Sequence, residues 1–162
     1  MCSSDLLSFA PFAPSITMEC GTSMSKEGMT RAFKFLRKVL SCEDLSHAGE
    51  PVNLNLYEAV MRLELPEGAS IGFDQHGSTD FVLRSDIESM NFVTLKEDIK
   101  LGTNQSKKKL VVETMVSDVN PSDYFVQKGQ DIILRKGVMP SMLTRNSRVI
   151  ADDCICYFLE RV

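Results

Sequence analysis

The feature that most constrains the fold is a change of hydrophobic period after Pro51. Beyond that residue, apolar and polar side chains alternate, and this pattern predicts half-buried β-strands rather than amphipathic helices. Leu54 and Leu56 start the alternation on one parity. The opposite parity then follows in Ala59, Met61, Leu63 and Leu65. A switch of parity near Glu58 predicts a β-bulge or two separate strand pieces, with a short helix as the alternative.

Short strand-like runs, separated by turn residues, continue from there to the C-terminus. The predicted strands cover residues 70–74, 80–84, 91–101, 109–116, 124–127, 131–135 and 149–161. Residues 102–106 have the length of a hairpin loop, so we expect the strands on either side of them to pair antiparallel. Many short strands with turns between them are typical of sandwiches and barrels. We predict a mainly β (α+β) chain, an antiparallel β-sandwich or barrel-like sheet with one N-terminal amphipathic helix packed against it.

The last predicted strand is unusual because it is apolar on both faces. Every residue from Cys154 to Leu159 is apolar or aromatic. Side chains of a strand point alternately to its two faces, so such a strand has to be covered on both. We therefore expect the C-terminal strand to lie in the centre of the sheet.

A single segment, residues 26–45, shows the helical period. Its apolar stripe contains Met29, Phe33, Leu36 and Leu40, and we expect this stripe to pack on the sheet. Five Lys or Arg side chains against one Glu give residues 24–40 a net charge of +4, whereas residues 41–162 carry −6. A basic amphipathic helix on an acidic body is suited to a membrane surface, a nucleic acid or an acidic partner. The candidate interaction residues on its basic face are Arg31, Lys34, Arg37 and Lys38.

The first residues of the chain differ in composition from the rest. Residues 1–23 contain two prolines, each ending a Phe-Ala-Pro repeat, and they show no lasting hydrophobic period. We predict a flexible leader over 1–23 and a single helix-plus-β domain over 24–162. If the leader is instead a short linear motif, Phe9 and Phe12 are its candidate anchors in a partner's groove.

Few side chains are arranged for catalysis or metal binding. The two histidines, His47 and His76, lie far apart, and Cys154 and Cys156 form one close pair where a zinc site of the common kind needs two. Residues 72–78 contain acid–base groups but lack the lysine of a phosphate-binding loop. We therefore predict no enzyme, no metal, no cofactor and no small-molecule substrate.

The densest positive cluster outside the helix is Lys107, Lys108 and Lys109. Lysines near a strand end are usually solvated, where they also discourage edge-to-edge aggregation. The three are candidate phosphate contacts, but the chain has no Trp and few aromatic residues near them for stacking on bases. Nucleic acid is therefore a secondary candidate partner.

The cysteine content bears on the compartment. Five cysteines without the spacing of a disulfide framework, together with nine methionines, indicate a reducing environment. Asp5 stands where a signal peptide would carry Lys or Arg, and Pro11 interrupts the apolar stretch after it. We expect the cytoplasm or the nucleus.

Two functions are compatible with these features. The first is a non-catalytic protein-interaction or self-assembly module that binds itself or another protein through a sheet edge, the helix or the leader. The alternative is a viral accessory or matrix-like structural protein that uses the basic helix, residues 26–40, against anionic lipid or nucleic acid. Salt separates the two, because binding through the basic helix weakens as salt rises and apolar strand pairing does not.

Overall fold

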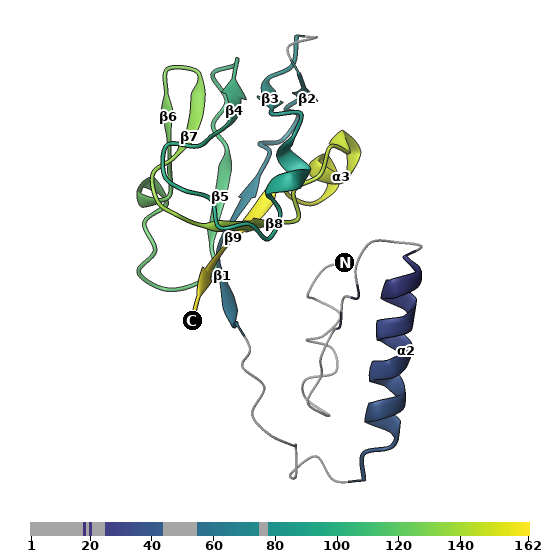
Figure 1. Cartoon of the computed structure of the whole chain (residues 1–162). Helices are drawn as coiled ribbons and strands as arrows, with labels where there is room; N and C mark the ends of the chain where they lie inside the picture. The colour runs from purple at the N-terminus through teal and green to yellow at the C-terminus, as the bar shows by residue number, and fades with distance from the viewer. Residues whose placement is uncertain (1–17, 19, 21–24, 44–54, 75–77) are drawn as a thin grey trace. The chain divides into compact units, whose positions relative to one another are not determined.

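The computed structural model describes residues 18, 20, 25–43, 55–74 and 78–162. The chain divides into two compact units, Met1–Val52 and Asn53–Val162. Helix α2 (Lys26–Leu40) belongs to the first unit, and the described strands all belong to the second (Figure 1). The expectation of a mainly β (α+β) chain is confirmed, while the division into 1–23 and 24–162 stays a prediction.

Sheet 1 has four antiparallel strands in the order β5-β1-β9-β8. Its strands are β1 (Tyr57–Glu64), β5 (Val111–Thr114), β8 (Met139–Ser141) and β9 (Cys156–Arg161). Strand β9 pairs with β1 on one side and β8 on the other, which confirms the central position expected for the C-terminal strand. The pairing of β1 with β9 shifts register between Ala59 and Met61, so the predicted bulge is also confirmed.

Sheet 2 has five strands in the order β2-β3-β4-β7-β6, which Figure 1 shows side by side. Its strands are β2 (Ile71–Phe73), β3 (Phe81–Leu83), β4 (Lys100–Asn104), β6 (Phe125–Lys128) and β7 (Asp131–Leu134). Strands β6 and β7 form an antiparallel hairpin. Gly129 in its turn has a φ of +65°, a conformation that glycine adopts without a steric penalty.

Strand β2 pairs with β3 in parallel, so the prediction of a purely antiparallel sheet is wrong. The N–H of Ser70 donates to Oδ2 of Asp80 over 2.9 Å, and the N–H of Asp80 donates to Oγ of Ser70 over 2.9 Å. Nζ of Lys108 lies 3.2 Å from the same Asp80 oxygen and donates to the carbonyl oxygen of Gly68 over 2.7 Å. This clamp holds the starts of both strands together, and strands joined at their starts run in the same direction.

The predicted strand over 91–101 is mostly absent, because β4 begins only at Lys100. Phe92 and Asp98 have φ angles of 59° and 64°, which interrupt an extended backbone. The loop runs beside β8 instead, where the N–H of Phe92 donates to the carbonyl of Pro140 over 2.8 Å. The predicted hairpin around 102–106 is also wrong, since β4 pairs with β3 and β7 while β5 belongs to sheet 1.

The segment before β9 is helical, so the predicted strand over 149–161 is too long. Helix α3 (Ser147–Asp152) begins after Asn146, whose Oδ1 accepts hydrogen bonds from the N–H groups of Arg148 and Val149 over 3.1 and 3.3 Å. This is the geometry of an N-cap. Two short 3₁₀ helices, η2 (Ile87–Met90) and η3 (Pro121–Asp123), are further elements that the sequence pattern did not predict.

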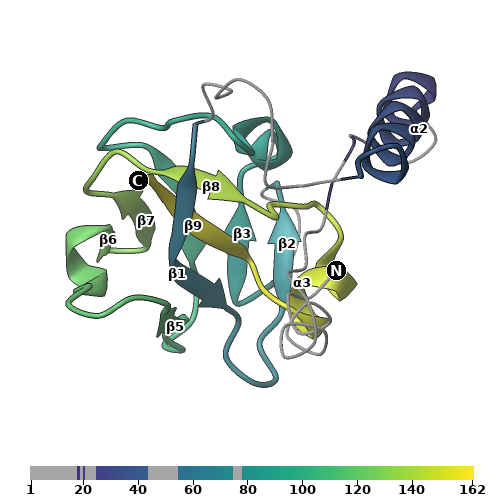
Figure 2. The same cartoon turned by 90° about the horizontal axis from the view of Figure 1, so that it is seen from below.

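Buried side chains from both sheets form one hydrophobic core. Met61 and Phe158 of sheet 1, and Phe81 and Leu134 of sheet 2, are 0% exposed. In Figure 2, β8 and β9 lie in front of β2 and β3. Among the described strands, neither sheet closes on itself.

Candidate interaction surface

Helix α2 is capped at both ends by residues next to it in the chain. Oγ of Ser25 accepts a hydrogen bond from the N–H of Gly28 over 3.1 Å, as an N-cap does. At the other end the N–H of Ser41 donates to the carbonyl of Arg37 over 3.0 Å. Glu27 in the first turn and cationic residues in the last turn complement the helix dipole. Ser25 therefore specifies the start of this helix locally, whereas the helix ends at Leu40, before the end that the hydrophobic period over 26–45 predicted.

The apolar stripe of α2 is exposed. Six large apolar side chains are between 37% and 77% exposed, and we call them the α2 stripe: Met29, Phe33, Phe35, Leu36, Val39 and Leu40. Gly28 is the buried residue of this helix. The expectation that the stripe packs on the sheet concerns the placement of one unit against the other and stays a prediction.

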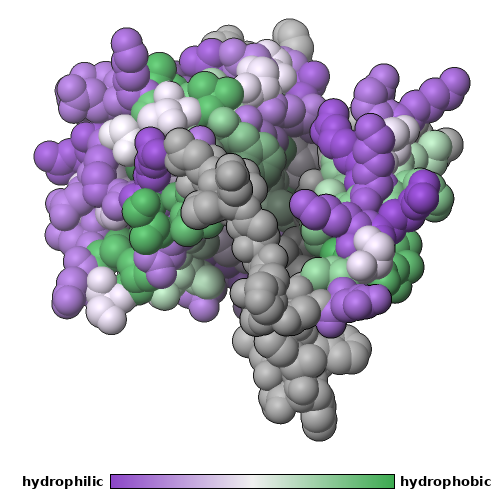
Figure 3. All heavy atoms as spheres, turned by 60° about the horizontal axis from the view of Figure 1, so that its bottom comes forward, coloured by the Kyte–Doolittle hydropathy of each residue, from purple (hydrophilic) through white to green (hydrophobic). Residues whose placement is uncertain are grey.

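The predicted cationic face is exposed as well, and it consists of Arg31, Lys34, Arg37 and Lys38. Figure 3, in which α2 lies on the right, shows hydrophilic and hydrophobic side chains gathered on different sides of the helix. At the border between them, the guanidinium of Arg37 lies 5.9 Å from the centroid of the Phe33 ring, within cation–π range. Helix α2 therefore presents an apolar and a cationic face together.

The other predicted contact residues are placed differently. Phe9 and Phe12 lie outside the described residues. Lys107 and Lys109 are exposed, whereas Lys108 is part of the clamp between β2 and β3. The N–H of Ser70 is the main reason that the pKa of Asp80 lies below its ordinary value, and Lys108 lowers it further. The three lysines thus do not form one cluster with a common role.

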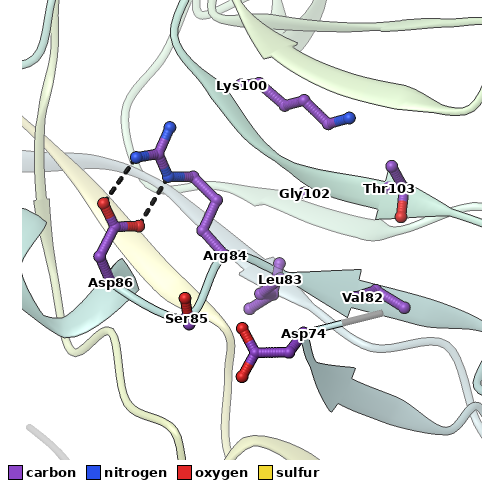
Figure 4. Close-up of a pocket in the computed structure, with 9 residues that line it drawn as sticks. All are labelled: Asp74, Val82, Leu83, Arg84, Ser85, Asp86, Lys100, Gly102 and Thr103. Atoms are coloured by element: carbon purple, nitrogen blue, oxygen red, sulfur yellow. Dashed lines mark hydrogen bonds and ion pairs between the residues drawn. The ribbon is translucent and has the colours of Figure 1, made fainter. Parts of the chain in front are cut away.

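A hollow of about 390 Å³ lies beside β3 and β4 (Figure 4). Arg84 donates from Nε and Nη2 to the two carboxylate oxygens of Asp86 over 2.7 and 2.6 Å, and this hydrogen bonding lowers the pKa of Asp86. Nζ of Lys100 lies 2.6 Å from a carboxylate oxygen of Asp131. Nη2 of Arg145 lies 3.5 Å from a carboxylate oxygen of Asp74. The charged side chains at this hollow are thus paired with charges of the same chain.

Cys156 in β9 and Cys154 just before it do not have the environment of reactive thiols. Cys154 and Cys156 are buried, and burial is the main cause that raises the pKa of each thiol. A thiol whose pKa is raised carries little thiolate at neutral pH, so it is a poor nucleophile and metal ligand. In the described part of the chain, no group of three His, Cys, Asp or Glu side chains could hold a metal ion. Both histidines, His47 and His76, lie outside that part.

Comparison of the chain with protein-family models, curated proteins and solved structures finds no match in any of the three. Within the described residues, none of the helices has the length and apolar composition needed to cross a membrane.

Sequence reasoning expected Phe33, Leu36 and Leu40 of the α2 stripe to pack on the sheet. The hydrophobic period of a helix is the same whether a sheet or an external partner covers its apolar face. Whether the sheet or an external partner covers Phe33, Leu36 and Leu40 therefore has no separate signal in the sequence. The only available sign was the charge contrast between residues 24–40 and the rest of the chain.

Proposed function

We propose that this chain is a non-catalytic interaction module and that α2 is its working surface. The observation that carries this proposal is the α2 stripe, six large exposed apolar side chains on one capped helix. Its partner is another protein, a second copy of the chain or an anionic surface, and no small-molecule substrate is expected.

The energetics of the helix support this role. A helix of about 15 residues is only marginally stable in water without tertiary contacts. Covering an exposed Leu or Phe side chain contributes about 1.5–3 kcal/mol. A partner that covers the stripe therefore stabilises α2 and gains binding free energy from the same contacts.

The sheet edges are weaker candidates for the same function. The side of β8 away from β9 is occupied by the loop between η2 and β4, where the N–H groups of Phe92 and Leu95 donate to the carbonyls of Pro140 and Val138. Exposed Lys107 and Lys109 precede the edge strand β5, and such lysines oppose strand pairing between molecules. Binding through β8 or β5 is thus secondary to binding through α2.

Two further proposals, one on the arrangement of the sheets and one on the compartment, accompany this function. The shared core of sheets 1 and 2 supports a sandwich arrangement for the second unit. The alternative use of the α2 stripe is against a sheet of the same chain, which would make it part of the core. Buried thiols at Cys154 and Cys156 with raised pKa values are compatible with the proposed cytoplasmic or nuclear location.

The test replaces Leu36 by Ala and measures the free energy of unfolding in urea, with Phe158→Ala as the core control. If the stripe is a working surface, Leu36→Ala changes stability by less than about 0.5 kcal/mol. Phe158 is 0% exposed, so Phe158→Ala should lower the free energy of unfolding by about 3–5 kcal/mol. A loss of about 2 kcal/mol or more at Leu36, at a concentration where the wild type is monomeric, would place the stripe in the core and refute the proposal.

A further inference from the structure

We propose that the partner of α2 is an anionic lipid bilayer, on which the helix lies parallel to the surface. This inference rests on the proposed function and names the partner of the same helix.

The apolar face is wide. At about 100° per residue, the stripe from Phe35 to Phe33 covers roughly 160° of the helix circumference. A coiled-coil seam uses a narrower arc, whereas a helix that lies in the interface of a bilayer buries close to half of its surface. All six side chains of the stripe can enter one flat apolar layer at the same time.

The cations border this face on both sides. Lys26 and Arg37 follow Phe33 around the helix, and Arg31 borders the stripe beyond Phe35. Long Lys and Arg side chains at such borders lie along apolar surface and place their charges at the level of lipid phosphates. The contact of Arg37 with the Phe33 ring at 5.9 Å shows one cation already at this border.

The charge distribution favours a surface with many negative charges in one plane. Residues 24–40 carry a net charge of +4 and residues 41–162 carry −6. An anionic bilayer attracts the helix and repels the rest of the chain, so the attraction is confined to α2. A nucleic acid would engage the same cations but would leave the α2 stripe in water, so it fits the helix less well.

The test is flotation of the full-length protein with vesicles of phosphatidylcholine alone or with about 30% phosphatidylserine. One variant reverses the cationic face by Arg31→Glu, Lys34→Glu and Lys38→Glu, and another removes apolar area by Phe33→Ser and Leu36→Ser. The matched controls are Lys96→Glu, Lys128→Glu and Arg148→Glu for charge, and Phe92→Ser with Val93→Ser for apolar area, all exposed and outside α2.

We expect binding to the phosphatidylserine vesicles that weakens as salt rises. At about 1 kcal/mol per cation, charge reversal on α2 should weaken binding at least about 100-fold. Removing the two apolar side chains should weaken it about 10-fold or more, and each control should stay within about 3-fold of the wild type at physiological salt.

Three results would overturn the bilayer as partner: equal binding to neutral vesicles, no vesicle binding, or binding to a mixed-sequence DNA duplex that needs the cations but not the stripe. Light scattering of the same variants separates this failure from failure of the proposed function. If the stripe variant loses self-association while vesicles do not bind, a second copy is the partner and the interaction module stands. If that variant loses stability in urea at a protein concentration where light scattering finds the wild type monomeric, the module proposal itself fails.

Discussion

Replacing Gly102 by Ala should separate two strands of sheet 2. Gly102 in β4 lies opposite Leu83 of β3. A Cβ at this position would be 2.3 Å from the carbonyl oxygen of Val82 and 3.0 Å from Cα of Leu83, whereas ordinary contacts begin at 3.4 Å. Both neighbours are backbone atoms, so the strands have to move apart by about 1 Å to relieve the overlap.

The expected loss of stability is about 3 kcal/mol. Overpacking costs about 1–3 kcal/mol, and the upper end applies because backbone cannot rotate out of the way. The bond from the N–H of Arg84 to the carbonyl of Leu101, 3.1 Å long, joins the same strands, and weakening it adds about 1 kcal/mol. Ala restricts the unfolded chain more than Gly does, and this effect stabilises the folded protein by about 0.4–1 kcal/mol.

The control is Gly129→Ala, which makes the same chemical change without an overlap. Nothing lies within 4 Å of a Cβ at Gly129, but its φ of +65° is left-handed. A left-handed Ala lowers the free energy of unfolding by about 1–2 kcal/mol. The restriction of the unfolded chain offsets part of this loss, as it does at Gly102. Urea unfolding followed by circular dichroism should therefore show a clearly larger loss for Gly102→Ala. If the loss at Gly102 equals or falls below that at Gly129, the close approach of β3 and β4 is wrong.

Three further predictions concern charge, thiols and backbone strain. The pKa values of Asp80 and Glu160 are lowered below the ordinary 3.8 and 4.5, so their stabilising contributions are present above those values and are lost as pH falls through the lower folded-state pKa values. Urea midpoints should fall between about pH 5 and pH 3, and less steeply after Glu160→Gln; an equal fall in the variant would contradict this account. In a variant whose other three cysteines are replaced by Ser, buried Cys154 and Cys156 should react with a thiol reagent only as fast as the protein unfolds. Fast labelling of the native protein would show that β9 is open. Phe92 combines a φ of 59° with 67% exposure, so Phe92→Asn should raise the free energy of unfolding by about 0.5–1 kcal/mol, and a loss above 1 kcal/mol would reveal contacts that the structure does not show.

The sequence by itself determined the elements whose signals are local. The helical period and Ser25 specify α2, and the parity switch after Glu58 marks the bulge in β1. The turn at Gly129 joins β6 to β7, and the run of apolar residues in β9 predicts its central place. Period and turn chemistry depend on neighbours in the chain, so they can be read without knowing the fold.

Only the tertiary structure decided which strands pair and which apolar faces are covered. The parallel pairing of β2 with β3 depends on Asp80 and Lys108, residues that are distant from one another in sequence. The partners of β4 depend on the absence of a side chain at Gly102. The period of the α2 stripe has the same limit, because an apolar period shows that a face needs covering and not what covers it. Strand partners and buried faces are set by contacts between distant residues, whose free energies exist only once the chain has brought them together.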